Sequence, residues 1–362
     1  MKILILDFFN ILKRYTCFVD MEKASFEEII DNLNYKLLNR FGNIIDEVKP
    51  DIVYFCGDSG SNIRAKSIIK EYKANRKKVS TGKKEKNETD FIEYFKQVLD
   101  TLPIIYLDVD HVEADMIIRC LVNYLTRLKP ETEIVIATSD SDMIQLLNTN
   151  ISIYDWKKGS ITPNNWYIKS KISDDFYINH KNYALFKSII GDKSDNIEGL
   201  KGIGWKTLLK MMMVINKEYD PFNVYYTDIE SLIEILSKLD KSKLDKIENK
   251  LVNKLISMFN ENISLIRRNL SVIDLSALET SFVFNIYSLI ERKMYDQKIK
   301  FDMHELIKHL VLNRFSTSDF EYAEILKKNK KACIPFYILL RKSIIALDQF
   351  KEKRNFLKRK YK

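Results

Sequence analysis

The stretch KILILD, residues 2 to 7, decides the fold, because it is a short aliphatic run that ends in an aspartate. A run of this length and composition predicts a β-strand. Three comparable runs follow at Asp51 to Cys56, Ile104 to Leu107 and Glu133 to Thr138, with helical periodicity between them. This alternation predicts βαβ units, and hence an α/β fold with a central, mostly parallel sheet flanked by helices.

Helices are expected to dominate the rest of the chain. Asn87 to Leu102 has a helical pattern, whereas Lys77 to Lys86 carries a single large apolar residue and is expected to be mobile unless something binds it. Beyond Tyr183 the apolar spacing predicts an amphipathic helix pair broken near Asp240. The residues of that pair expected in the core are Leu232, Leu236, Leu239, Leu244, Ile247, Leu251 and Leu255.

The composition is that of a folded protein with about two domains' worth of residues. Of 362 residues 46% are hydrophobic and only 9 are Gly and 6 Pro, which excludes disordered and collagen-like chains. The 4 cysteines lie far apart without a CxxC or Cys/His cluster, so we expect neither disulfides nor zinc, and a cytoplasmic location. No signal peptide or membrane span is expected, because no apolar run approaches ~18 residues.

The net charge of +9 is concentrated in two segments. Residues 64 to 86 hold 10 basic and 2 acidic residues, and residues 323 to 362 hold 13 basic and 3 acidic ones. The remainder of the chain is therefore net acidic. Basic segments beside an acidic body favour a polyanionic partner, since they release counterions from a phosphate backbone. A solvated lysine-rich surface is the other interpretation of the charge alone.

Acidic residues follow each predicted strand, where ligand sites form in open parallel sheets. Converging carboxylates repel one another unless a cation neutralises them, and hard oxygen ligands suit Mg²⁺ or Mn²⁺. Helix capping explains single cases such as Asp140, but not paired acids on successive loops. Asp192 and Asp195 would share a face if their turn is helical. The predicted metal ligands are Asp7, Asp58, Glu113, Asp115, Asp140, Asp142, Asp192 and Asp195.

Three glycines, Gly199, Gly202 and Gly204, form a short turn before an apolar helix predicted at Leu208 to Val214. Glycines let backbone amides approach a phosphate, and a helix start adds a favourable dipole. Alone, the pattern also fits a plain turn between helices. Its place directly after the pair of aspartates favours phosphate binding.

Together these motifs resemble the 5′-nuclease family, which includes flap endonucleases, the 5′-nuclease domain of bacterial DNA polymerase I and the RNase H (5′-3′ exonuclease) of T-even-type bacteriophages. The likeness is greatest to the last group. It covers about residues 1 to 215 and, more faintly, Asn269 to Leu275. The matching segments are Asp7 to Asn10, Gly57 to Ser59 with Arg64, Glu71 to Arg76, Glu113 to Asp115, Ser139 to Leu146 and Gly191 to Gly204.

The resemblance implies a division of the chain into three parts. Residues 1 to 190 would form a PIN-like, Rossmann-like catalytic domain with a helical arch at about 64 to 100. Residues 191 to 312 would form a helix-three-turn-helix DNA-binding and helical region. Residues 313 to 362 would be a basic, helical C-terminal extension, whose last residues, Lys351 to Lys362, we expect to add salt-dependent affinity for DNA.

The resemblance also assigns roles to residues. Asp7, Asp58, Glu113 and Asp115 would hold a first metal ion and the other four aspartates a second, with K⁺ at the glycine turn. Lys73 and Arg76 would be catalytic at the scissile phosphate, with Tyr72 stacked on a base. The implied nucleic-acid contacts are Arg64, Tyr72, Lys73, Arg76, Gly199, Gly202, Gly204, Lys206 and Thr207.

The implied function is that of a metal-dependent, structure-specific 5′-nuclease of DNA replication or repair. Two ions would drive hydrolysis to 5′-phosphate and 3′-hydroxyl ends. Substrates would be DNA with 5′ flaps or nicks and RNA-DNA hybrids, including RNA primers. A single-stranded-DNA-binding protein is an implied partner, and we expect a monomer without membrane contact.

Three departures from the family pattern leave alternatives open. The start reads Asp7-Phe8-Phe9-Asn10 in place of Asp-Gly-x-Asn, the glycine turn lacks prolines, and Met116 replaces a common carboxylate. The missing carboxylate favours, as one alternative, a catalytically weakened structure-specific DNA-binding protein. A PIN-type ribonuclease, which shares the acidic sheet edge but lacks the arch and the glycine turn, is the other.

Overall fold

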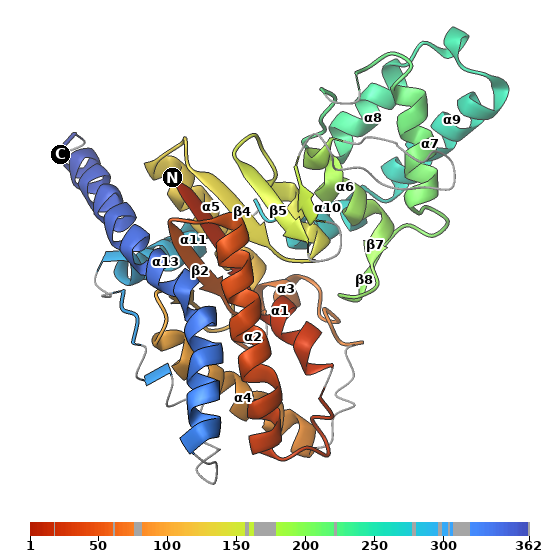
Figure 1. Cartoon of the computed structure of the whole chain (residues 1–362). Coiled ribbons are helices and arrows are strands. Elements are labelled where there is room, and N and C mark those ends of the chain that lie inside the picture. Colours follow the sequence, from red (N-terminus) through yellow and green to blue (C-terminus); the bar gives the residue numbers. More distant parts are fainter. Residues whose placement is uncertain are drawn as a thin grey trace.

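A six-stranded sheet forms the centre of the computed structural model, in the order β3-β2-β1-β4-β5-β6 (Figure 1). Every neighbouring pair is parallel except the antiparallel pair β5 and β6. The predicted α/β fold with a mostly parallel sheet is therefore confirmed, although the sequence prediction lacked β5 and β6. The strands are β1 (Lys2–Asp7), β2 (Ile52–Cys56), β3 (Ile105–Leu107), β4 (Glu133–Ala137), β5 (Ile151–Asp155) and β6 (Gly159–Ile161). The structure describes residues 1–17, 19–60, 62–75, 82–155, 159–162, 179–220, 223–276, 280–295, 299–302, 305–306 and 319–360.

Alternate side chains of β1 enter two different cores, because successive residues of a strand point to opposite faces. Ile3 and Ile5 pack in one core with α5 (Ala114–Leu128) and α11 (Thr280–Tyr295). Leu4 and Leu6 pack in the other with α1 (Phe8–Thr16), α2 (Phe26–Val48) and α4 (Gly82–Asp100). Helices thus cover both faces of the sheet (Figure 1).

The predicted arch falls on α3 (Ile63–Ile68), α4 and the turn between them. Residues 76–81 lie outside the described part of the chain. Residues 82–86, expected to be mobile, instead form the first turn and a half of α4, and this expectation was wrong for them. One turn later in α4, Asn87 is buried and donates to the carbonyl of Met21 at 2.8 Å, which holds the start of the helix to the body.

A helical lobe follows the sheet in the chain and extends from it at the upper right of Figure 1. Its apolar residues are buried as predicted at Leu232, Leu236 and Leu255, but Ile247 is 79% exposed, so its predicted core position was wrong. Ile247 lies in the first turn of α9, where Asp245 caps the helix and the turn faces solvent. The elements are α6 (Tyr183–Ile190), β7 (Gly191–Asp192), β8 (Ile197–Glu198), α7 (Trp205–Ile215), α8 (Ile229–Lys238), α9 (Lys246–Glu261) and α10 (Ile263–Ile273), with 3₁₀ turns η2 (His180–Asn182) and η3 (Lys241–Lys243). A further 3₁₀ turn, η1 (Ser141–Leu146), lies between β4 and β5.

The last helix, α13 (Asp319–Lys360), joins the two cores. Phe336 belongs to the core with α2, whereas Phe350 belongs to the core with α5. Between them Ser343 donates to the carbonyl of Asp51 at 3.0 Å, just before β2 begins. The middle of α13 therefore packs against the amino-terminal edge of the sheet, opposite the edge that carries the acidic residues. None of the helices within the described ranges is long and apolar enough to cross a membrane.

Candidate active site

Asp7 lies at the end of β1, between β2 and β4, where the order of the strands reverses. Its side chain accepts from the amide of Asn10 at 3.2 Å, which caps α1, and from Thr138 Oγ1 at 2.8 Å. The pKa of this carboxyl is raised to about 7, mainly by burial and also by the nearby charges of Asp58 and Asp140, against the hydrogen bond from Thr138. A carboxylate held here is energetically costly without a positive partner.

Asp58, Glu113 and Asp115 meet at the amino end of α5. Asp58 follows β2 and accepts from the amide of Ala114 at 2.6 Å, so it caps a helix from another loop. Burial raises its pKa, with Glu113 adding to the rise. Burial and the charge of Glu113 likewise raise the pKa of Asp115 well above its usual range. The three carboxylates are crowded, which is the electrostatic condition that a cation relieves.

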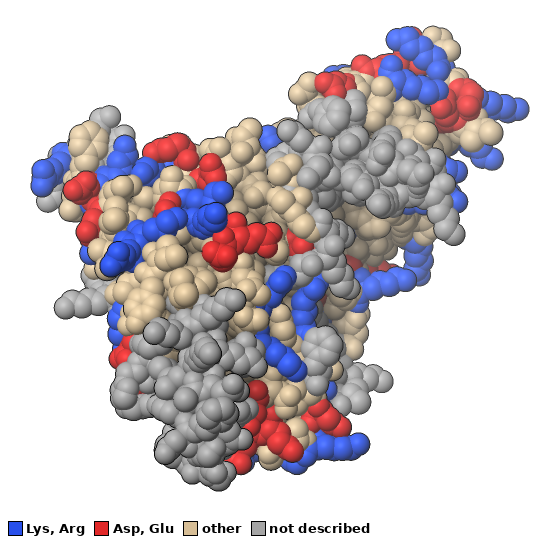
Figure 2. All heavy atoms as spheres, in the orientation of Figure 1, with Lys and Arg blue, Asp and Glu red and all other residues tan. Residues whose placement is uncertain are grey.

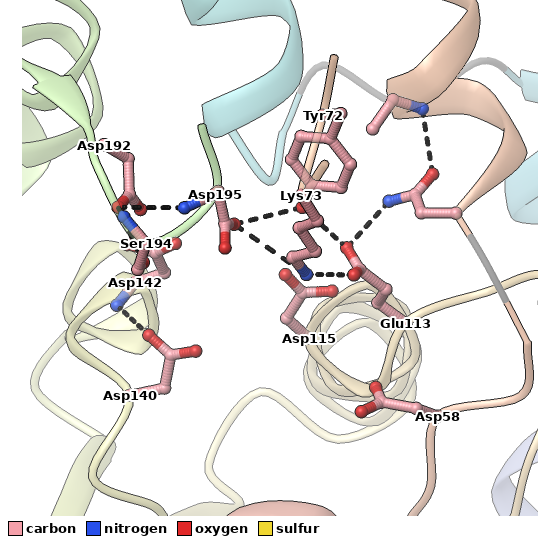
Figure 3. A network of polar contacts seen from close by, with 12 residues as sticks. Asp58, Tyr72, Lys73, Glu113, Asp115, Asp140, Asp142, Asp192, Ser194 and Asp195 are labelled. Atoms are coloured by element: carbon pink, nitrogen blue, oxygen red, sulfur yellow. Dashed lines mark hydrogen bonds and ion pairs between the residues drawn. The ribbon is translucent and has the colours of Figure 1, made fainter. Parts of the chain in front are cut away.

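Lys73 and Tyr72 connect Glu113 to Asp195 (Figure 3). The Tyr72 hydroxyl lies 2.9 Å from Glu113 Oε2 and 3.1 Å from Asp195 Oδ2. The Lys73 ammonium is paired with Glu113 and lies 3.8 Å from Asp195 Oδ2. Burial alone would raise the pKa of Glu113, but Lys73 and the hydrogen bond from Asn62 outweigh it and lower the pKa. The base of the predicted arch is thereby joined to the acidic hairpin.

Lys187 on α6 makes the corresponding connection on the other side. Its ammonium is paired with Asp142 of η1 and lies 2.6 Å from Asp192 Oδ2 at the start of the hairpin. Burial raises the pKa of Asp142 to about 6 despite this partner. Burial alone would lower the pKa of Lys187, but the carboxylate of Asp142 dominates and raises it. Lys187 is therefore a buried cation between acids of two elements.

A cavity of about 310 Å³ opens between these groups. Its walls combine eight charged side chains with the aromatic rings of Tyr183 and Trp205, which stack at 5.8 Å between centroids. The remaining three predicted ligands, Asp7, Asp58 and Glu113, do not line the cavity but border it through interactions with Lys73 and Asp140. The charged wall residues are Lys73, Asp115, Asp140, Asp142, Lys187, Asp192, Lys193 and Asp195.

The donor chemistry of this site fits Mg²⁺ or Mn²⁺, because every acid supplies hard oxygens and several are destabilised as bare carboxylates. Over the described ranges, however, no three acids, cysteines or histidines stand close enough together to hold a metal ion. The prediction of one closed cluster of eight carboxylates was wrong in this respect. The physical reason is that the ammonium groups of Lys73 (Figure 3) and Lys187 lie among the acids and separate them into smaller groups.

Asp192 and Asp195 do not lie in a helical turn, so the condition under which they were expected to share a helix face is not met. Gly191 and Asp192 pair with Ile197 and Glu198 in an antiparallel hairpin, and its turn is fixed by Asp192. Asp192 Oδ1 accepts from the amide and the hydroxyl of Ser194, at 2.8 and 2.6 Å. The hairpin turn directs both aspartates to the cavity.

The glycine turn divides into packing and exposed positions. A Cβ on Gly199 would lie 2.1 Å from the carbonyl carbon of Ile190, so this glycine is needed for the backbones to approach. Gly202 has φ of +80° and is exposed, as are Gly204 and Lys206, while Thr207 is half-buried. Gly199 thus has a packing role, whereas the three exposed positions remain predicted nucleic-acid contacts.

The predicted contacts near the arch are arranged differently from expectation. Tyr72 is only 5% exposed and packs with Ile69 and Ile197, so its ring offers no free face for a base in this conformation. Arg64 donates to the carbonyl of Ser271 at 2.8 Å, which ties α3 to α10. Arg76 lies outside the described residues. Lys73, in contrast, reaches the cavity wall.

Met116 does not face the carboxylates. It is 3% exposed and lies in the core with Ile117 and Leu121. Sequence reasoning missed Lys187, although a lysine in the otherwise apolar helix YALFKSII, five residues before Asp192, is a detectable signal. It also missed Asn269, which is fully buried and donates to the carbonyls of Ser188 and Glu198, at 3.0 and 2.7 Å, and so positions the hairpin.

Comparison with known families agrees with this geometry. The model of the 5′-3′ exonuclease N-terminal, resolvase-like domain matches residues 2–176. A 5′-3′ exonuclease of Buchnera aphidicola subsp. Schizaphis graminum is 31% identical over 219 residues, which cover 59% of this chain and 70% of that protein. The chain belongs to the 5′-3′ exonuclease, or 5′-nuclease, family. The closer likeness to T-even-type enzymes stays a prediction.

Other relatives are longer than the matched region. DNA polymerase I of Caldicellulosiruptor bescii is 29% identical over 249 residues, which are 68% of this chain and 27% of the polymerase. The chain thus spans about a quarter of that relative. Among solved structures, the zinc-bound 5′-exonuclease of bacteriophage T5 superposes with a TM-score of 0.57 at 19% identity, covering 81% of this chain and all of that one. This likeness shows a shared fold.

Proposed function

We propose that the protein is a metal-dependent, structure-specific 5′-nuclease that acts on DNA with 5′ flaps or nicks and on RNA-DNA hybrids. The observation that carries the proposal is the cavity in which acids from β4-η1, α5 and the β7-β8 hairpin meet three lysines, Lys73, Lys187 and Lys193. Family membership supports hydrolysis of phosphodiesters. Removal of RNA primers and recruitment by a single-stranded-DNA-binding protein belong to the same proposal, as do a cytoplasmic location and a monomer.

The acids of the cavity and its border are the proposed ligands of two Mg²⁺ or Mn²⁺ ions. Asp7, Asp58, Glu113 and Asp115 would hold one ion, and Asp140, Asp142, Asp192 and Asp195 the other. Bound there, the ions would polarise the phosphodiester and lower the pKa of water. The flap endonuclease of bacteriophage T5, solved with DNA and metal ions, has the same fold and supports this assignment.

Lys73 is the proposed catalytic cation of the chain itself. Its ammonium lies in the cavity wall and its backbone amide donates to the carbonyl of Asp195 at 2.8 Å, which fixes the residue in place at φ +57°. A pre-positioned cation stabilises charge that develops on phosphate oxygens in the transition state. Tyr72 is a proposed positioning residue, since its hydroxyl fixes Glu113 and Asp195.

The proposed path for nucleic acid continues from this cavity. A larger cavity of about 1,070 Å³ lies between α3 and the glycine turn, with Lys70, Lys193 and Arg268 in its walls. Figure 2 shows further basic side chains on the outer part of the helical lobe and at the C-terminal end of α13. A positive groove that tracks a phosphate backbone gives salt-dependent, sequence-independent affinity. K⁺ at the glycine turn remains a proposal on the family resemblance.

One panel of labelled substrates tests the proposal. Flapped DNA, nicked DNA, an RNA-primed duplex and single-stranded RNA are incubated with Mg²⁺ or with EDTA. We expect Mg²⁺-dependent release of the 5′ segment from the first three. Cleavage of single-stranded RNA alone would instead favour a PIN-type ribonuclease, and binding without cleavage would favour the catalytically weakened binding protein.

A further inference from the structure

A second cavity lies behind the candidate active site and has no role in the proposed chemistry. Its volume is about 290 Å³. Residues of α5, η1 and α6 line both cavities. On α5, Asp115 reaches the first cavity and Arg119, one helical turn later, the second. On α6, Lys187 lines the first, whereas Leu185 lines the second.

Arg119 is the unusual residue of this cavity. Its Nε atom is buried, and within the described part of the chain it has no hydrogen-bond partner. A buried polar group without a partner costs free energy, and a guanidinium is retained at such a place where a ligand supplies the acceptor. The one acid in the wall, Asp274, accepts from the amide and the hydroxyl of Ser276, at 2.7 and 2.9 Å. Burial lowers the pKa of Arg119, and the charge of Asp274 only partly opposes this effect.

The opposite wall adds a cation and an aromatic ring. The Lys181 ammonium lies 5.4 Å from the centroid of Tyr225, whose side chain is 50% exposed. Between the two walls, Gln145 donates to the carbonyl of Ile273 at 3.1 Å and accepts from the amide of Leu275 at 3.2 Å, so the frame of the cavity is fixed. Two cations beside an exposed ring match a phosphate linked to a nucleobase.

We propose that this cavity binds a single nucleotide unit, with Arg119 and Lys181 on its phosphate and Tyr225 against its base. The volume is at the small end of ligand pockets, which suits one nucleotide and not a duplex. The nucleotide is either a free monophosphate or one residue of a bound strand. The site uses none of the proposed metal ligands, so nucleotide binding here can be tested independently of the nuclease proposal.

Calorimetry on the full chain tests the site in EDTA at low salt, where the carboxylate cavity repels anions. The ligands are thymidine 5′-monophosphate, inorganic phosphate and a hexathymidylate. We expect Arg119→Gln to weaken nucleotide binding at least about tenfold, because a charge-assisted hydrogen bond is lost. Tyr225→Ala should weaken the two nucleotide ligands and leave inorganic phosphate unchanged. Loss confined to the hexathymidylate assigns the site to a strand, and loss of the monophosphate as well assigns it to free nucleotide.

Arg127→Gln is the matched control. Arg127 lies on the same helix, is exposed, and its guanidinium lies 6.0 Å from the centroid of the Tyr287 ring, away from the cavity. The Arg127→Gln substitution removes the same charge as Arg119→Gln, and this variant should bind the three ligands with wild-type affinity. Lys181→Gln, at an exposed position, keeps the test valid if Arg119→Gln does not fold. The proposal is overturned if the Arg119 and Lys181 variants bind all three ligands as the control does, or if no ligand binds the wild type.

Discussion

The ammonium of Lys187 lies 2.6 Å from Asp192 Oδ2 while it also pairs with Asp142, so one lysine of α6 holds the β7-β8 hairpin to η1. All three side chains are largely buried. Without this cation the two aspartates would face each other across a cavity that already contains Asp140 and Asp115. Lys187 therefore stabilises the arrangement of acids to which we assign a metal ion.

Lys187→Gln should destabilise the metal-free protein by about 3 kcal/mol, because removing one partner of a buried ion pair leaves an uncompensated charge. Mg²⁺ should restore more stability in this variant than in the wild type, since it replaces the missing cation. Thermal unfolding with EDTA and with Mg²⁺ measures both effects. Lys238→Gln, which removes an exposed pair with Glu234, is the control and should change stability by less than about 1 kcal/mol. Equal losses in both variants would contradict the role of Lys187.

The stability of the metal-free protein should depend on pH through Asp7. Burial raises the pKa of Asp7 to about 7, above its value in the unfolded chain, so the folded state binds the extra proton. The free energy of unfolding should therefore decrease as the pH rises from about 4 to 7. Asp7→Asn should make this decrease smaller and be the more stable protein at pH 8. The remaining decrease is expected from Asp58, Asp115 and Asp142, whose pKa values burial also raises.

Denaturant unfolding in EDTA at several pH values measures the effect. Asp46→Asn changes an exposed residue of α2 and should keep the wild-type slope. A slope in Asp7→Asn equal to that of the wild type would show that Asp7 does not contribute to it.

Asp142→Asn and Asp58→Asn should each abolish cleavage of flapped DNA but retain DNA binding. Each variant removes one proposed metal ligand, while the basic surfaces that bind the phosphate backbone are unchanged. A cleavage assay and a binding titration on the same substrate separate the two effects. Activity retained in either variant would refute the role of that residue.

Lys73→Ala should reduce turnover by about 100-fold or more and weaken DNA binding far less, because a transition-state contact acts on kcat. Single-turnover kinetics at saturating enzyme measures the chemical step directly. Lys66→Ala, a change at an exposed position of α3, is the control and should retain the wild-type rate. If Lys73→Ala changes affinity alone, its proposed role is wrong.

The C-terminal basic residues should contribute to the salt dependence of DNA binding. Replacing Lys351 and Lys353 by Gln should lower the slope of log affinity against log salt by about 1 to 2. Point substitutions are preferable to deletion, because Arg354 pairs with Glu291 at 2.5 Å and helps to hold α13 in place. An unchanged slope would indicate that these lysines only face solvent.

The parts of this fold that follow from local sequence were predictable. The strand of residues 2 to 7 and its neighbours could be read from short aliphatic runs, and the aspartates after them from the rule that sites form at the carboxyl ends of parallel strands. The β5-β6 hairpin was not predicted, since Gly159–Ile161 is short and pairs only through tertiary contacts.

Side-chain pairing at the site was less predictable. Lys187 and Lys73 reach the acids because α6 and the turn after α3 pack close to the edge of the sheet. The spacing of residues in the sequence does not predict this tertiary packing. Ile247 follows the apolar period of its helix but lies in a turn that nothing covers among the described residues. Tyr72 is an aromatic residue in a basic segment, which predicted stacking on a base. Its hydroxyl instead lies within hydrogen-bond distance of the carboxylates of Glu113 and Asp195.

Calorimetric titration of Mn²⁺ into the metal-free protein tests the central claim most directly. We predict uptake of two ions by the wild type, and the loss of one of them in Asp58→Asn and of the other in Asp142→Asn. No uptake by the wild type, or uptake of two ions by either variant, would contradict the assignment of these carboxylates as a metal site.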